Sequence, residues 1–346
     1  MKSTVFVKAG KVEVKDVEKP TVQASDDVII RVVRTCVCGS DLWAYRGLED
    51  KAANSENTGH EAIGVVEEVG SAITTVVPGD FVIAPFTHGC GHCAACRAGF
   101  DGDCQDHDDN FSSGVQAEYI RFAHGEWALV KIPGKPEDYS EAMLDSLLTL
   151  ADVMATGYHA ARVANVHAGS TVVVVGDGAI GLCGVIAARM RGAKRIIAMS
   201  RHEDRQKLAT EFGATDIVAK RGDDAVKKVM ELTNNDGADA VLECVGTELS
   251  NETATQVARP GAIVGRVGLP HEPKMDMAPS FYNNISIAGG PASVTTYDKS
   301  VLLKAVLDGD IHPGKVFTKS FKLDDIDDAY KAMANREAIK SLVVTD

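Results

Sequence analysis

The side chains best suited to hold a metal ion stand in three short segments that are far apart in the sequence. Cys38 comes soon after an apolar run over residues 28–33, His60 follows Gly59, and Asp152 lies in a mostly apolar stretch. A thiolate, an imidazole and a carboxylate are ligands that a catalytic zinc ion takes, with the fourth position left open for substrate. A lone Cys after a strand is more often a core residue, so the prediction of a zinc site depends on all three residues together.

Three polar residues beside these candidate ligands are candidates for catalytic roles. Asp41 could accept the second ring N–H of His60 and fix its tautomer, and Glu61 could do the same or act as an exchangeable fourth ligand. Ser40 offers a hydroxyl that could bond a substrate oxygen and pass its proton on. Ser40 and Asp41 could also cap a helix that starts at Leu42, and both roles are compatible.

The segment that carries Asp152 reads as a helix over residues 146–159, mostly apolar and with one acid in it. Burying an unpaired carboxylate costs roughly several kcal/mol, so we expect Asp152 to have a partner, and a zinc ion would serve as one. The alternative is an Asp on a solvated face of the helix.

A second group of thiols has the spacing C-x2-C-x2-C-x7-C and comprises Cys90, Cys93, Cys96 and Cys104. Four thiolates close a tetrahedral shell and leave no open position, which predicts a structural zinc ion. An iron–sulfur cluster also takes four cysteines, but it usually has Pro after the last one, and here Gln105 follows. We expect two zinc ions per chain, with this second one in a lobe over about residues 88–108.

A glycine-rich loop follows the apolar run over residues 171–175 and matches G-x-G-x-x-G. Between a strand and a helix, these glycines allow a tight turn and let a pyrophosphate approach the helix N-terminus. Asp177 adds a negative charge inside the loop, and the sequence leaves its direction open. The residues that we expect to contact a dinucleotide here are Gly176, Gly178, Ala179, Ile180 and Gly181.

The end of the second strand indicates which dinucleotide is bound. An NAD site would have Asp or Glu there for the ribose 2′-OH, but this chain has Ser200 and Arg201, with Arg205 one helical turn later. These residues suit a 2′-phosphate, so the motif favours NADP, and NAD is the alternative. Later strand ends should lie near the nicotinamide, at Val245, Val267, Gly268 and Leu269.

The elements that must position these residues fall into two predicted domains. Short strands over 28–37, 62–69 and 79–84, separated by turns, predict a β-rich, barrel-like domain over residues 1–153. Strands alternating with helices over 154–290 predict a doubly wound parallel sheet, and residues 291–346 should return to the first domain. The six strands of the sheet are expected over 171–175, 195–199, 216–219, 238–243, 262–267 and 285–288.

The composition excludes several classes of protein. With 346 residues, 45% hydrophobic and 25% charged, the chain is typical of a globular protein with room for two domains. A net charge of −13 and the lack of a Lys/Arg stripe argue against nucleic acid as a partner. No run suits a membrane span, and no signal-peptide pattern opens the chain. We expect a cytoplasmic protein whose cysteines stay reduced.

In their order and spacing, these motifs resemble the zinc-dependent medium-chain alcohol dehydrogenases over the whole length of the chain. The resemblance implies an α/β protein with a GroES-like catalytic domain, a Rossmann domain, and assembly as a homodimer or homotetramer. It makes Cys38, His60 and Asp152 the catalytic zinc ligands, as in the Asp-bearing bacterial secondary alcohol dehydrogenases. It makes Ser40 the hydroxyl that contacts the substrate oxygen.

One residue departs from the family pattern. Many members have a His three residues past Ser40 that ends a proton relay, and this chain has Trp43 there. A relay through Ser40 would therefore reach water another way, and Trp43 could instead form a wall of the substrate pocket. Phe86 and Phe111 are the other candidates for apolar pocket walls, and all three could equally be core residues.

The expected reaction is reversible hydride transfer between NADP(H) and a primary or secondary alcohol, with an aldehyde or ketone as the product. Zinc would act as a Lewis acid on the substrate oxygen. Two alternatives stay open: a polyol or sugar dehydrogenase of the same family, and a non-catalytic NADP-binding relative. A non-catalytic relative has no need of Cys38, His60, Asp152 and Ser40 together, so their joint presence argues against it.

Overall fold

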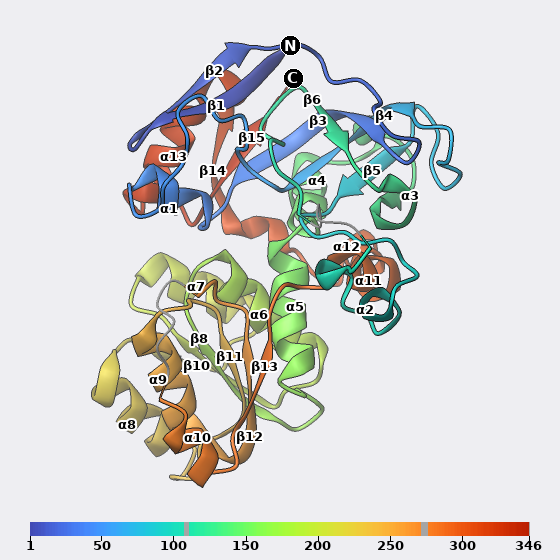
Figure 1. The fold of residues 1–346 in the computed structure, drawn as a ribbon. Helices are drawn as coiled ribbons and strands as arrows, with labels where there is room; N and C mark the ends of the chain where they lie inside the picture. Colours follow the sequence, from blue (N-terminus) through green and yellow to red (C-terminus); the bar gives the residue numbers. More distant parts are fainter. Residues whose placement is uncertain (107–110, 271–275, 346) are drawn as a thin grey trace. The chain divides into compact units, whose positions relative to one another are not determined.

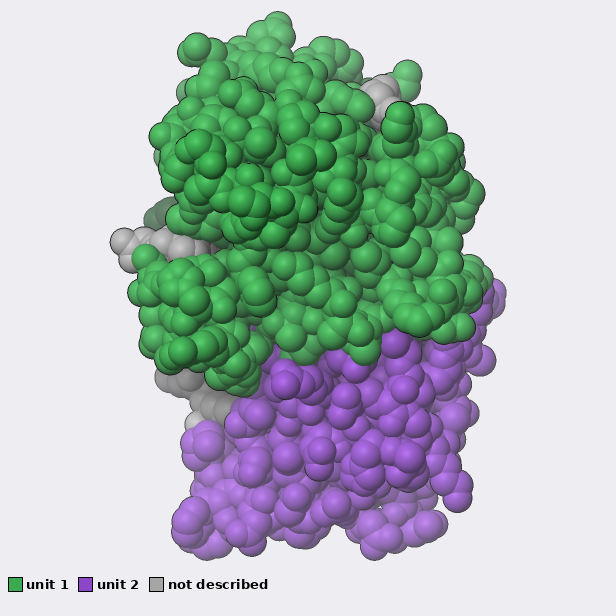
Figure 2. All heavy atoms as spheres, turned by 90° about the vertical axis from the view of Figure 1, so that its right-hand side faces the viewer, with its two compact units in different colours: residues 1–152, 293–346 green, residues 153–292 purple. Residues whose placement is uncertain are grey.

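The computed structural model of the chain describes residues 1–106, 111–270 and 276–345. Contacts divide the chain into two compact units (Figure 2). Unit 1 comprises Met1–Asp152 and Ser293–Asp346, and unit 2 comprises Val153–Ala292. Along the described parts of the chain, none of the helices combines the length and apolar character that crossing a membrane requires.

Unit 1 is built on two β-sheets within its described residues (Figure 1). The larger sheet has the strand order β14-β15-β3-β4-β5-β7, with β6 pairing with β3, and the smaller is the hairpin β1-β2. All pairs are antiparallel except β14 with β15. The strands are β1 (Lys2–Lys8), β2 (Lys11–Asp16), β3 (Val28–Val37), β4 (Ala62–Val69), β5 (Phe81–Ala84), β6 (Tyr119–Phe122), β7 (Val130–Ile132), β14 (Phe317–Lys322) and β15 (Lys340–Val344).

The end of the chain completes unit 1. The last helix, α13 (Ile326–Ala334), lies beside β2, β14 and β15. Figure 1 shows α13 and β14 in red next to the blue strands β1 and β2. The buried face of α13 packs with Leu42 and Tyr45 of α1 (Asp41–Tyr45). The first and last segments of the chain therefore share one hydrophobic core. The other helices and helical turns of this unit are α2 (Ala94–Arg97), η1 (Asp101–Asp103), α3 (Gly125–Ala128), η2 (Pro136–Asp138), α4 (Glu141–Thr149), α11 (Val294–Tyr297), η3 (Asp298–Leu302), α12 (Leu303–Leu307), η4 (Pro313–Val316) and η5 (Leu323–Asp325).

The helix predicted over 146–159 is wrong in one respect, because the structure interrupts it. Helix α4 ends at Thr149 and α5 (Val153–Val163) begins at Val153, so that Asp152 lies in the turn between them. The backbone N–H of Phe86 donates to the Ala151 carbonyl at 2.9 Å. In a continuous helix, this carbonyl would instead accept a backbone N–H of the helix itself. The interruption positions Asp152 beside the segment that follows β5.

Unit 2 holds a six-stranded parallel sheet in its described residues, with the order β10-β9-β8-β11-β12-β13. Helices cover both faces (Figure 1), with α5, α6 and α7 on one side and α8, α9 and α10 on the other. The strands are β8 (Thr171–Val175), β9 (Arg195–Met199), β10 (Asp216–Val218), β11 (Ala238–Glu243), β12 (Ala258–Arg266) and β13 (Ser286–Gly289). The helices are α6 (Ala179–Met190), α7 (Glu203–Phe212), α8 (Gly222–Leu232), α9 (Glu248–Val257) and α10 (Ala278–Tyr282), with α5 as given above.

This arrangement confirms the predicted fold class. Val173 of β8, Val241 of β11 and Val264 of β12 share one hydrophobic core with residues of α8 and α9. Strands buried on both faces read as continuous apolar runs, which is why the sequence revealed them. The prediction for β12 started too late, since this strand begins at Ala258 and includes Pro260 and Gly261.

Candidate metal and nucleotide sites

The structure brings together the three predicted zinc ligands and Glu61. Ligand atoms of Cys38, His60, Glu61 and Asp152 all lie within 4.8 Å of one another. The Nε2 atom of His60 is 3.4 Å from Oδ2 of Asp152, and Sγ of Cys38 is 3.8 Å from the same oxygen. Cys38, Glu61 and Asp152 are buried. One sulfur, one nitrogen and carboxylate oxygens at these separations fit a zinc ion. We call these four residues the mixed cluster.

Asp41 has a different partner from the one expected. Its Oδ2 accepts the backbone N–H of Cys38 at 2.9 Å, whereas its Oδ1 lies 3.7 Å from Nδ1 of His60, too far for a hydrogen bond. Asp41 therefore orients the loop that carries Cys38. Ser40 stands at the N-cap position of α1, but among the described residues its hydroxyl makes no capping bond. That hydroxyl is thus not required by the helix.

Gly59 positions His60 through its backbone. Its φ is +68°, and a Cβ at this position would lie 2.6 Å from the side chain of Gln116. Gln116 is itself fixed, because its Nε2 donates to the Cys36 carbonyl and its Oε1 accepts the Tyr330 hydroxyl. Only glycine combines this φ with such close contact. The turn before β4 is therefore held against β3, which Cys38 directly follows.

Glu61 makes a buried ion pair that we did not predict. Its Oε1 is 2.6 Å from Nζ of Lys340, and both side chains are 1% exposed. Lys340 also donates to the Val37 carbonyl at 3.3 Å. Burial alone would lower the pKa of Lys340, but nearby acidic groups, including Glu61, raise it well above its usual value. Among the described residues, Oε2 of Glu61 has no hydrogen-bond partner. A signal existed in the sequence, since Lys340 opens an apolar final strand.

Two of the three predicted pocket aromatics lie close to one another. The ring of Phe86 is 5.9 Å from the His60 ring and 6.4 Å from that of Phe111, which is 49% exposed. Trp43 is partly buried on α1. These positions make Phe86 a neighbour of the mixed cluster, and the assignment of all three as pocket walls stays a prediction.

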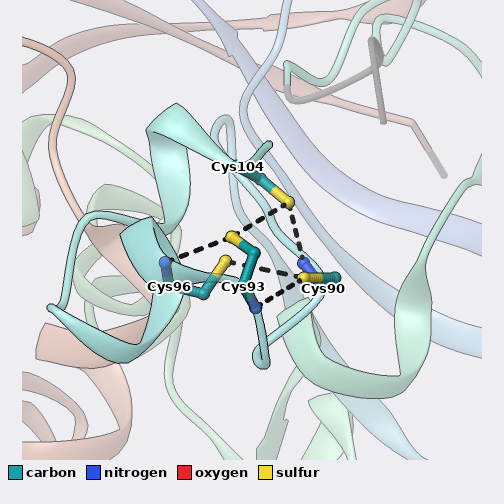
Figure 3. Close-up of side chains that lie close together, drawn as sticks. All are labelled: Cys90, Cys93, Cys96 and Cys104. Carbon is teal, nitrogen blue, oxygen red and sulfur yellow. Dashed lines mark hydrogen bonds between the residues drawn. The ribbon is translucent and has the colours of Figure 1, made fainter. Parts of the chain in front are cut away.

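The four cysteines of the lobe converge as one cluster (Figure 3). The Sγ atoms of Cys90 and Cys96 are 4.0 Å apart, as are those of Cys93 and Cys104. Backbone N–H groups donate to three sulfurs, from Cys90 to Cys104, from Cys93 to Cys90, and from Cys96 to Cys93. Bonds from backbone N–H groups lower the pKa of Cys93 to about 6, which favours its thiolate. Four thiols in this arrangement fit a zinc ion with a closed shell. Residues 107–108, predicted to end the lobe, lie outside the described residues.

The glycine-rich loop follows β8 and leads into α6. Gly176 has φ +116°, and a Cβ on Gly181 would lie 2.0 Å from the Gly176 carbonyl oxygen. A Cβ on Gly178, by contrast, would meet no atom within 4 Å. The loop therefore needs glycine for its own turn at Gly176 and Gly181, and it leaves open space at Gly178, before the N-terminus of α6. This arrangement fits a pyrophosphate.

The residues predicted to select the cofactor interact with the loop. The Ser200 hydroxyl donates to Oδ2 of Asp177 at 2.8 Å, and Nη1 of Arg205 is 3.1 Å from Oδ1 of the same carboxylate. Arg201, between them in sequence, is exposed. Asp177 thus points toward the end of β9, which answers the question that the sequence left open.

Glu243, a residue to which we gave no role, accepts hydrogen bonds from the segments that follow β11 and β12. Its buried Oε1 accepts the backbone N–H groups of Val245 and Gly246, and its carbonyl accepts those of Val267 and Gly268. A Cβ on Gly268 would lie 2.2 Å from the Gly246 nitrogen. Glu243 therefore fixes both predicted nicotinamide-contacting segments. An acid at the end of an apolar strand was the available signal.

Fold and sites together define a class of protein: a zinc-binding oxidoreductase with a dinucleotide-binding sheet. Comparison with known families agrees, since residues 24–134 match the alcohol dehydrogenase GroES-like domain and residues 179–302 match the zinc-binding dehydrogenase family. An alcohol dehydrogenase of Cupriavidus necator is 30% identical over an alignment of 360 residues, gaps included. The alignment covers 97% of this chain and 96% of the relative. The chain belongs to the zinc-dependent medium-chain alcohol dehydrogenases.

Two further comparisons give a relative and a solved structure. The NADP-dependent isopropanol dehydrogenase of Clostridium beijerinckii is 34% identical over 261 residues, covering 72% of this chain and 71% of that protein. Among solved structures, the alcohol dehydrogenase TADH from Thermus sp. ATN1 matches with a TM-score of 0.89 and 30% identity over 100% of both chains. This likeness supports the assignment of a GroES-like part and a Rossmann sheet.

Proposed function

We propose that this oxidoreductase transfers a hydride reversibly between NADP(H) and a primary or secondary alcohol, or the matching aldehyde or ketone. The observation that carries the proposal is the convergence of Cys38, His60 and Asp152, the first and last of which are 114 residues apart in the sequence. A structural role alone would not require donors of three kinds gathered from three segments. A zinc ion bound there would supply Lewis-acid chemistry to the substrate oxygen.

In this proposal, the chain's own groups orient the substrate and move its proton. The Ser40 hydroxyl, uninvolved in capping α1, bonds the substrate oxygen and passes its proton on. Asp41 keeps the loop of Cys38 and Ser40 in place through its bond to the Cys38 N–H. Lys340 holds the Glu61 carboxylate and so limits its approach to the other ligands. Phe86, beside His60, forms an apolar wall that favours simple alcohols over polyols.

The cofactor assignment rests on Ser200 and Arg201 at the end of β9, where an NAD site would have an acid. The name of the NADP-dependent relative supports it. The nicotinamide would lie near Val245, Val267, Gly268 and Leu269, which Glu243 holds in place. We further propose that unit 1 is the catalytic domain and unit 2 the dinucleotide-binding domain, and that the protein is a cytoplasmic homodimer or homotetramer.

The test combines metal analysis with a substrate panel. We expect two zinc ions per chain by elemental analysis, and turnover of primary or secondary alcohols, aldehydes or ketones with NADP(H) above that with NAD(H). A preference for polyols or sugars would favour the alternative within the family. One zinc ion per chain and no turnover of any substrate with either cofactor would overturn the proposal in favour of a non-catalytic relative.

A further inference from the structure

The Asp177 carboxylate binds two of the three residues that we assign to the 2′-phosphate of NADP. It accepts the Ser200 hydroxyl at 2.8 Å and pairs with Arg205 at 3.1 Å, and Arg205 also donates to the Asp177 carbonyl at 3.3 Å. The Asp177 and Arg205 side chains are only 21% and 15% exposed. Such partial burial makes the pair stronger than one at a fully solvated surface.

The carboxylate stands where dinucleotide-binding sheets usually have an acid, although it comes from another segment. β8 and β9 are adjacent parallel strands, with Val175 opposite Met199. Asp177 follows the first of them and Ser200 the second, and their hydrogen bond spans the gap at the carboxyl end of the sheet. In sites that select NAD, an Asp or Glu at the end of the second strand binds the ribose 2′-OH. Here the glycine-rich loop supplies the acid.

This placement has opposite consequences for the two cofactors. A ribose 2′-OH can donate to the Asp177 carboxylate. A phosphate monoester carries about −1.5 to −2 charges at neutral pH, so it would be repelled by that carboxylate and would have to compete with it for Ser200 and Arg205. Exposed Arg201 would remain to attract the phosphate.

We infer that Asp177 is a specificity-determining residue that opposes the NADP preference conferred by Ser200 and Arg201, so that the protein uses both cofactors. The inference rests on the proposed function, and it places the choice between cofactors in the glycine-rich loop as well as at the end of β9. Replacing the carboxylate with a neutral amide should make the protein selective for NADP.

The experiment measures binding by calorimetry to the zinc-loaded protein, with two probes: 2′,5′-ADP, which carries the 2′-phosphate, and ADP, which has a free 2′-OH. We expect Asp177→Asn to tighten 2′,5′-ADP about tenfold and to weaken ADP several-fold, because one repelling charge is removed and one acceptor for the 2′-OH is weakened. The ratio of kcat/KM for NADP to that for NAD should move in the same direction. Asp177→Ser serves as the second variant if Asp177→Asn fails to fold.

Arg201→Ala separates this inference from the proposed function. We expect it to weaken 2′,5′-ADP and to leave ADP unchanged. If Arg201→Ala has no effect on 2′,5′-ADP, the assignment of the NADP site is wrong, whatever Asp177 does. If Arg201→Ala behaves as expected but a folded Asp177 variant leaves the ratio of the two affinities unchanged, or moves it toward ADP, the inference about Asp177 is overturned.

Discussion

The two cysteine-containing clusters of unit 1 differ in where their residues come from. The four thiols of the lobe belong to residues 90–104, and backbone N–H groups of the same segment bond their sulfurs. The mixed cluster takes Cys38 from the residue after β3, His60 and Glu61 from the turn before β4, and Asp152 from the junction of α4 and α5. One cluster is organised by local sequence and the other by the packing of distant elements.

The clusters also differ in the charges around them. The lobe gathers four thiols, which suits a closed shell, and His92 and Asp106 lie close to one of them, Cys90. The mixed cluster has a fourth potential donor, Glu61, that is engaged by Lys340 from the other end of the chain. The comparison teaches that a short segment can supply all the ligands of a closed metal site. A site with an open position takes its ligands, and the residues that orient them, from several elements.

The largest expected effect comes from removing a ligand of the mixed cluster. Asp152→Ala should lower turnover by about a thousandfold or more and remove one zinc ion, since loss of mere support for a ligand already costs 10–100-fold. Elemental analysis and steady-state kinetics check both. Asp145→Asn on α4 is the matched control and should keep both zinc ions. Normal turnover by the Asp152 variant would refute the ligand assignment.

The buried ion pair behind the mixed cluster should come next. Lys340→Met leaves the Glu61 carboxylate buried without its partner, and we expect a loss of about 3–5 kcal/mol in the free energy of unfolding. Urea denaturation measures it. The double variant Lys340→Met, Glu61→Gln should recover most of the loss, because neither position of the pair then carries a charge. A single variant as stable as the parent protein would show that the pair has no such role.

The smallest effect on function is expected in the lobe. Cys104→Ser should remove the other zinc ion and lower the free energy of unfolding by about 2 kcal/mol, since the lobe depends on its metal, while the mixed cluster keeps its ion and its turnover at moderate temperature. Elemental analysis, thermal unfolding and kinetics on the same sample check this. Cys183→Ala, in the core of α6, should keep both ions. If the Cys104 variant lost its turnover together with the zinc ion of the lobe, the two clusters would not be functionally independent, and the prediction would be wrong.

What could be predicted from the sequence follows this same division. The four-cysteine spacing, the glycine-rich loop and the apolar strands of unit 2 are local patterns, and the structure has them within a few residues of their expected positions. The break between α4 and α5 was missed because residues 146–159 favour a helix throughout, whereas the bond from Phe86 to Ala151, which helps to stabilise the interruption, comes from a distant segment.

Other features depend on partners that no local pattern identifies. Glu61 and Lys340 are 279 residues apart, and Asp41 turned out to bond the Cys38 backbone instead of the His60 ring. Asp177 is an acid in a loop until the fold brings Ser200 and Arg205 to it. Such pairings depend on which elements become neighbours, and side-chain periodicity carries no information about that.

The sequence by itself determined the chemical identity of the donors and the elements that carry them, because residue type and short-range spacing govern turns, strands and local thiol clusters. Only the tertiary structure decided which acid faces which base. Those choices arise when strands and helices far apart in the chain bury their polar side chains together and must satisfy one another's charges.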